Sequence, residues 1–167
     1  MDLFDTKFLK NKLRYLLQCL LAALSVLVML LILDALSNAA VIASLGASSF
    51  IAFTMPHAQV SRPRFLIGGY VVGVGAGTLC HWLSQLTSPT SLPVLQDQSY
   101  VVFAAAAVGL AIFVMVVTNT EHPPAAGVAL GLVLGECRPM TVVVVLLGII
   151  VLSILSKLLR PILRNLL

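Results

Sequence analysis

The placement of charged residues is the strongest constraint on the fold of this chain. Its ten Lys and Arg and its six Asp and Glu residues all fall outside six apolar stretches. A bare charge at the middle of a bilayer costs about 2.5 kcal/mol or more, so this separation is typical of membrane-spanning segments. The stretches are residues 15–33, 39–55, 65–86, 100–117, 123–135 and 141–156. We therefore predict an all-α membrane protein with about six hydrophobic helices.

Composition excludes several classes of protein. The 167 residues are 60% hydrophobic and 10% charged, whereas charged residues make up roughly 25% of a soluble domain. The net charge of +4 comes from Lys and Arg at the chain ends and in short gaps, without a basic stripe or interleaved aromatic residues. We predict the lipid bilayer as a partner and no nucleic acid. The three cysteines lack metal-binding spacing, so neither a metal nor a cofactor is predicted.

The basic residues also predict the topology. Lys and Arg in short loops gather on the cytoplasmic side of a membrane. Six crossings place both basic ends of the chain there together with Arg62 and Arg64, and leave Arg138 on the other side. Five crossings would put the basic tail outside, so we prefer six. The predicted organisation is a basic cytoplasmic segment (1–14), a single transmembrane domain (15–158) and a basic cytoplasmic tail (159–167).

Two of the six segments are too short for a regular span. At 1.5 Å per residue, 123–135 covers roughly 20 Å of a hydrocarbon core of about 30 Å. Segment 39–55 is also short, and residues 44–49 are small and polar enough to weaken a helix. Residues 34–46 and 119–131 follow a similar order of polar and small side chains. This similarity suggests an inverted 3+3 repeat, as in many transporters, with chance similarity as the alternative.

The residues between the fourth and fifth segments concentrate unusual chemistry. Thr118–Pro124 reads TNTEHPP, and its prolines end one helix and begin the next. A helix that begins inside the protein directs N–H groups and a partial positive charge at what precedes it, which suits a small anion. His122 could add a titratable donor, and Glu121 could orient it or relay protons. The alternative is an ordinary helix break.

A second cluster closes the second segment and opens the third. His57, Arg62 and Arg64 flank a proline-rich break and could draw an anion to the cytoplasmic mouth. Alternatively, the arginines are only topology anchors. The predicted substrate-binding residues are His122, Pro123, Pro124, Asn119, Thr118, Glu121, His57, Arg62 and Arg64. No catalytic motif accompanies them, so we do not predict an enzyme.

Two glycine ladders have a spacing of four residues, which places each set on one helix face. Such glycine-zipper faces allow helix backbones to approach closely, within one chain or between subunits. The ladders are Gly69, Gly73 and Gly77 in the third segment and Gly127, Gly131 and Gly135 in the fifth. With the small size of the chain, they predict a homo-oligomer.

Several short motifs occur in an order that resembles the HPP family of integral membrane proteins. They are Leu45–Ser48, Pro56–His57, Arg62–Arg64, Gly68–Gly69 and Glu121–Gly127. The resemblance covers nearly the whole chain, and His122, Pro123 and Pro124 are the residues that give the family its name. It implies a small bundle, conventionally of about four spans plus shorter elements, found in bacteria, cyanobacteria, fungi and plants.

Plant and cyanobacterial members of that family are associated with nitrite transport. The resemblance therefore implies a transporter or channel for a small inorganic anion, nitrite first. The expected location is a bacterial or cyanobacterial plasma membrane, or an organelle envelope in a eukaryote. Two alternatives stay open: a channel or carrier for another small solute or proton-coupled ion, and a scaffold subunit that transports nothing.

Overall fold

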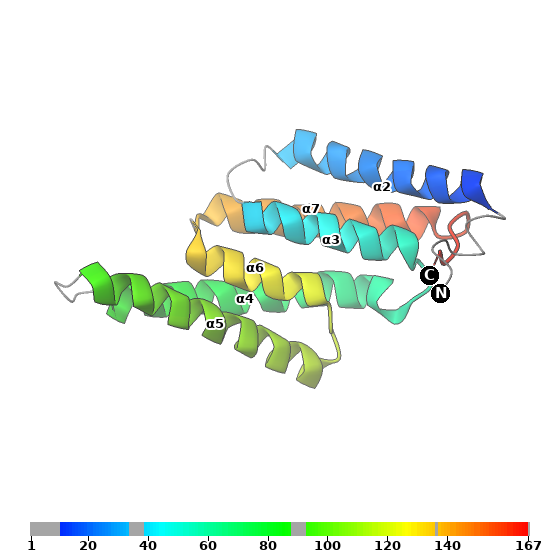
Figure 1. The fold of residues 1–167 in the computed structure, drawn as a ribbon. Coiled ribbons are helices and arrows are strands. Elements are labelled where there is room, and N and C mark those ends of the chain that lie inside the picture. Colours follow the sequence, from blue (N-terminus) through cyan, green and yellow to red (C-terminus); the bar gives the residue numbers. More distant parts are fainter. Residues whose placement is uncertain (1–10, 34–38, 88–92, 136, 167) are drawn as a thin grey trace, which may run out of the picture.

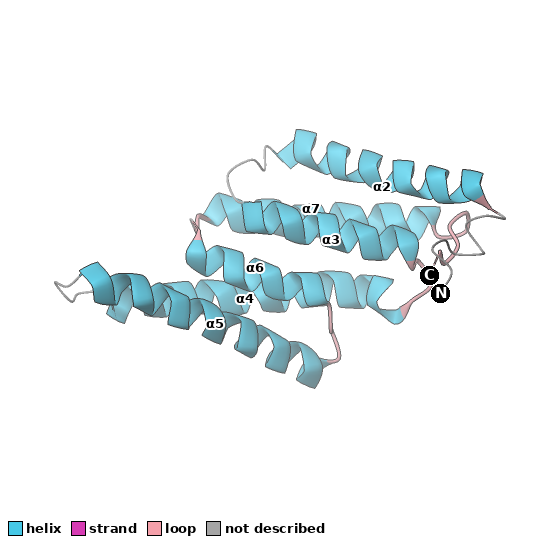
Figure 2. Cartoon of the chain, in the orientation of Figure 1, coloured by secondary structure: helices cyan, strands magenta, loops and turns pink. Residues whose placement is uncertain are grey.

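The structure, a computed structural model, describes residues 11–33, 39–87, 93–135 and 137–166. Throughout these ranges the regular structure is helical (Figure 2). The helices are α2 (Lys12–Leu33), α3 (Ala39–Thr54), α4 (Pro63–Thr87), α5 (Pro93–Thr118), α6 (Pro123–Leu134) and α7 (Pro139–Leu159), with a 3₁₀ turn η1 (Gln59–Ser61). The prediction of an all-α fold with six hydrophobic helices is confirmed.

Helix length separates the long elements from the short ones. Three helices are long and apolar enough to cross a membrane: Pro63–Leu86, Tyr100–Thr118 and Pro139–Leu159. The 22 residues of α2 reach a similar length. In contrast, α3 has 16 residues and α6 has 12, or about 24 Å and about 18 Å of helix against a core of about 30 Å. Four long helices and two short ones agree with the architecture that the family resemblance implies.

The helix α3 is short, as predicted, and it continues without a break through residues 44–49. Ser44 donates to the carbonyl of Ala40 at 2.8 Å, and Ser48 donates to the carbonyl of Ser44 at 3.0 Å. These bonds satisfy the hydroxyl groups inside the helix, so the polar stretch continues it. The start of α5 also differs, because the helix begins at Pro93 rather than Tyr100. An apolar stretch marks the part inside lipid, whereas the helix itself extends into the more polar residues before it.

The short helix α6 lies in the middle of the bundle, in contact with α3, α4 and α5 (Figure 1). Glycines make this close packing possible. A Cβ atom built at Gly69 would lie 2.6 Å from the Cβ of His122, and one at Gly77 would lie 2.9 Å from the Cα of Ala129. On the opposite face of α6, a Cβ at Gly127 would lie 2.7 Å from the Oγ of Ser44.

The glycine ladder of α4 therefore packs against α6 within the chain. It is not available to a second subunit. The homo-oligomer stays a prediction, and it would have to use another surface.

The helix contacts have an internal symmetry. The packed helix pairs are α2–α3, α2–α7, α3–α6, α3–α7, α4–α5, α4–α6, α4–α7 and α5–α6. This set is unchanged when α2, α3 and α4 are exchanged with α5, α6 and α7. The exchange also matches the two short helices with each other, at the centre of the bundle. The contacts are thus those expected of an inverted 3+3 repeat, although residues 34–38 of the first repeat lie outside the described residues.

The beginning of α2 and the C-terminal tail meet at one end of the bundle (Figure 1). The hydroxyl of Tyr15 donates to the carbonyl of Leu166 at 2.8 Å, and Nε2 of Gln18 donates to the carbonyl of Arg164 at 2.9 Å. The N–H of Leu166 donates to the carbonyl of Thr54 at the end of α3, also at 2.8 Å. An even number of helices that alternate in direction requires this common end.

Candidate functional site

The imidazole of His122 is buried where α6 begins. His122 is the residue before Pro123, with φ −140° and ψ 95°, and only 1% of it is exposed. Its Nε2 lies 2.8 Å from the Oγ of Ser48 on α3, and that Oγ lies 2.8 Å from the hydroxyl of Tyr70 on α4. Ser48 and Tyr70 are fully buried. Three elements thus contribute to one polar network inside an apolar core.

The number of donors and acceptors on the Ser48 hydroxyl determines the directions of these hydrogen bonds. Its hydroxyl has one hydrogen and two acceptor lone pairs, and it contacts the carbonyl of Ser44, which can only accept. For all three contacts to be hydrogen bonds, Ser48 donates to Ser44 and accepts from Tyr70 and His122. Neutral His122 then carries its hydrogen on Nε2. Its Nδ1 keeps a bare lone pair, and this buried atom has no hydrogen-bond partner.

A cavity of about 290 Å³ lies beside His122, between α5 and the start of α6. Apolar side chains of α5 form one wall, among them Ile112, Met115 and Val116. Glu121 and His122 contribute the ionisable groups. Glu121 is half-buried here, whereas the hydrogen bond of His122 goes to Ser48. The cavity is therefore mostly apolar, with a carboxyl group and an imidazole at one side.

The first turn of α6 offers few backbone donors. Pro123 and Pro124 have no N–H group, and the N–H of Ala125 already donates to the carbonyl of His122 at 2.9 Å. The unpaired N–H groups expected from the sequence are thus not available in the first three residues. An anion at this position would depend on side chains and on the dipole of a short helix.

A family model described as the HPP transmembrane region matches residues 9–165. The chain belongs to the HPP family. No curated protein and no solved structure matches it. The resemblance based on short motifs is therefore confirmed. The HPP residues of the family name, His122, Pro123 and Pro124, lie where the polar network meets the short central helix.

The residues before the HPP motif close the end of α5. Asn119 has a positive φ of 53°, its N–H donates to Val116 at 3.3 Å, and the N–H of Thr120 donates to Met115 at 2.9 Å. This is a Schellman ending, in which Asn is one of the residues that tolerate a left-handed backbone. Thr118 donates through Oγ1 to the carbonyl of Val114 at 2.7 Å. Both predicted binding residues thus have clear structural roles.

The second predicted cluster divides between two places. Arg64 donates through Nη2 to the carbonyl of Thr118 at 3.1 Å, which links the start of α4 to the end of α5. His57 instead contacts the C-terminal tail: its N–H donates to Oδ1 of Asn165, and its Nε2 lies 3.1 Å from the carbonyl of Leu163. Arg62 is exposed. The structure therefore brings Arg64 to the residues before the HPP motif, whereas His57 helps to hold the tail.

Ser48 and Tyr70 are site residues that the sequence pattern did not predict. Ser48 lies in the polar stretch of α3, and Tyr70 directly follows the pair of glycines in α4. A hydroxyl group inside an apolar membrane helix needs a hydrogen-bond partner, so each of these residues predicts a polar contact. Their partner could not be identified, because the network joins residues that are far apart in the sequence.

Proposed function

We propose that this HPP protein is a transporter or channel for a small inorganic anion, with nitrite as the first candidate, rather than an enzyme. The observation that carries the proposal is the bond between His122 and Ser48 at the start of α6. Ionisable side chains inside a membrane protein are costly and mark substrate or proton pathways. A short helix that begins beside such a group is also a recurrent element of transporters.

The protonation of His122 would create an anion site. Its Nε2 is held by Ser48, so an added proton goes to Nδ1 and produces a positive charge and a new donor. A small anion supplies both an acceptor and a negative charge. Nitrite and a proton could then move together without net charge, which favours a proton-coupled mechanism.

The basic residues support one orientation of the protein in the membrane. Lys12, Arg14 and the tail lie at the end of the bundle where α2 begins and α7 ends. We propose that this end faces the cytoplasm, in agreement with the distribution of Lys and Arg in short loops. The membrane would be a bacterial or cyanobacterial plasma membrane, or an organelle envelope.

Nitrite uptake into proteoliposomes tests the proposal. We expect saturable uptake by the native protein and its loss in His122→Ala. His81→Ala is a matched control, because His81 lies on α4 outside the network, and it should retain uptake. Equal rates for the native protein and His122→Ala would reject the site.

Competition in the same assay separates the alternatives. Inhibition by nitrate, formate or chloride would define the class of anion. Flux of a cation or of an uncharged solute without nitrite flux would reject the proposal that the substrate is an anion. A stoichiometric partner that co-purifies with a protein lacking any flux would favour the scaffold.

A further inference from the structure

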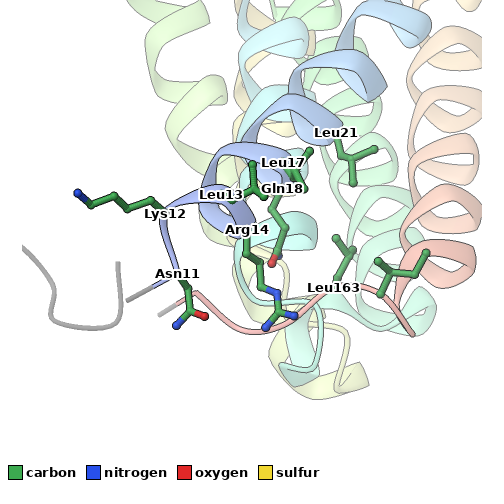
Figure 3. Close-up of a pocket in the computed structure, with 9 residues that line it drawn as sticks. Asn11, Lys12, Leu13, Arg14, Leu17, Gln18, Leu21 and Leu163 are labelled. Atoms are coloured by element: carbon green, nitrogen blue, oxygen red, sulfur yellow. The ribbon is translucent and has the colours of Figure 1, made fainter. Parts of the chain in front are cut away.

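A second cavity, which shares no lining residue with the cavity at His122, lies in the groove between the start of α2 and the C-terminal tail (Figure 3). Its volume is about 580 Å³. Leu13, Leu17 and Leu21 of α2 form one side, and Ile162 and Leu163 of the tail form the other. Leu13 and Ile162 are 70% and 71% exposed. The groove is thus open and mostly apolar, and it lies on the surface of the bundle.

Polar and basic groups gather at one end of this groove. Asn11, Lys12 and Arg14 belong to the first turn of α2 and its preceding residue. Figure 3 shows Arg14 directed toward the tail, whereas Lys12 extends outward at the margin of the groove. The leucines continue from here along α2 into its apolar part. The groove is therefore cationic at one end and apolar along the rest of its length. An amphiphile with an anionic headgroup and an apolar chain has the complementary pattern.

Few negative charges offset these cations within the described part of the chain. Glu121 is the only carboxylate whose side chain is described, and it lines the other cavity. An anionic ligand is thus favoured by Lys12 and Arg14, the two cations that line the groove.

We infer that this groove is a binding site for an anionic phospholipid. Lys12 and Arg14 would contact the phosphodiester group, and Leu17, Leu21 and Ile162 would contact an acyl chain. Basic residues next to a membrane helix attract anionic headgroups, and the long Lys and Arg side chains can reach the interface while their stems stay on apolar surface. A free phosphate ion would satisfy the cations but would leave the leucines exposed.

The position of the tail gives this lipid a structural effect. Gln18 at the base of the groove is 3% exposed and donates to the carbonyls of Phe53 and Arg164. A lipid in the groove would contact α2 and the tail together, and it would shield these hydrogen bonds from water. The bound lipid would thus hold the C-terminal tail against the ends of α2 and α3.

Native mass spectrometry of the purified full chain tests this inference. The probes are phosphatidylglycerol and phosphatidylcholine with identical acyl chains, and glycerol phosphate without chains. We expect the native protein to prefer phosphatidylglycerol, and Lys12→Gln with Arg14→Gln to reduce that preference about thirtyfold, at about 1 kcal/mol for each basic residue. The matched control, Arg62→Gln with Lys157→Gln, removes the same charge outside the groove and should keep the preference. Leu17→Trp fills the groove and should lower phosphatidylglycerol binding without any change in charge.

Three outcomes would overturn the inference. One is an equal loss of preference in the two double variants, since that result would assign the effect to diffuse charge. Another is binding of glycerol phosphate as strong as that of the lipid, which would indicate a site for a soluble phosphate. The third is unchanged phosphatidylglycerol binding in Leu17→Trp. Binding of phosphatidylcholine should be the same in the native protein and the two double variants, and thermal unfolding in detergent reports that every variant is folded.

Discussion

The Oγ of Ser48 and the Nε2 of His122 lie 2.8 Å apart, although 74 positions separate the two residues in the chain. This bond joins the two short helices, because Ser48 belongs to α3 and His122 immediately precedes α6. It also fixes the imidazole so that its other nitrogen is the one available for a proton. The family motif and the middle of the bundle are thus connected through a single hydroxyl group.

Ser48→Ala should destabilise the protein. The substitution leaves the Tyr70 hydroxyl and the His122 Nε2 buried without their partner, and each such group costs about 1–3 kcal/mol. The neighbouring Ser49 provides a matched control, because its Oγ is buried and already has no partner. Ser49→Ala should therefore change stability little. Thermal unfolding in detergent measures both variants, and equal losses would contradict the assigned network.

Gly73→Ala should separate α4 from α6. A methyl group at Gly73 would overlap the carbonyl oxygen of Ala125, whereas one at Gly75 meets no atom within 4 Å. Overpacking of this kind typically costs about 1–3 kcal/mol. Gly75→Ala should instead be neutral or stabilise the helix by up to about 1 kcal/mol. The two unfolding temperatures give a direct comparison, and a stable Gly73→Ala protein would show that the helices do not pack as described.

Two substitutions of Asn119 distinguish a role in the backbone turn from a role in substrate binding. Its φ of 53° suits glycine, so Asn119→Gly should keep both stability and nitrite uptake. Asn119→Val should lose about 1–2 kcal/mol, since a left-handed backbone is unfavourable for an L side chain. Stability and uptake are measured on the same preparations. A stable Asn119→Gly protein without uptake would show that the amide itself contacts the substrate.

Nitrite uptake should rise as the pH falls. In the proposed mechanism, His122 takes a proton on Nδ1 before it binds an anion, so acidity increases the competent fraction. Uptake at several pH values, corrected for nitrous acid that crosses protein-free liposomes, measures the effect. His122→Gln cannot be protonated in this range and should show no uptake above the protein-free background at any pH. A native protein whose corrected uptake is constant with pH would exclude this mechanism.

Gln18→Leu should release the C-terminal tail. The substitution removes the donors to Phe53 and Arg164, at 2.8 Å and 2.9 Å, while its volume and burial stay similar. Limited proteolysis should then cut the tail sooner than in the native protein. Cys19→Ala is the control, because Cys19 is the exposed neighbour on α2. Identical cleavage of the two variants would show that Gln18 does not hold the tail.

The helices could be predicted closely from charge placement, because the cost of a charge in lipid acts residue by residue. The start of α6 at Pro123 follows from proline chemistry alone. Residues 44–49 were expected to weaken α3, but they are part of a continuous helix. The hydroxyl groups of Ser44 and Ser48 donate to carbonyls in the preceding turn of the same helix. The start of α5 was missed because the apolar boundary marks the membrane and not the helix.

The site could be predicted only in part. The motif located His122 at a helix break, since prolines act on their own neighbours. Its partners Ser48 and Tyr70 come from α3 and α4, and only tertiary packing brings them together. The same limit applies to His57, whose contact with Leu163 spans 106 positions. Local chemistry was readable from the sequence, whereas partners from other helices were not.

The short length of α6 would also shape the electric field. In Figure 1, α6 begins short of the end of the bundle where α3 ends and α4 begins. Wherever water reaches the loop before Pro123, the membrane voltage falls over the 12 residues of α6, about 18 Å, and not over a full span. A charge that enters from this end and stops at His122 would have crossed little of that voltage. For an anion that moves without a proton, almost all the electrical work would belong to the step beyond the imidazole, so voltage would act on its release to the far side more than on its binding.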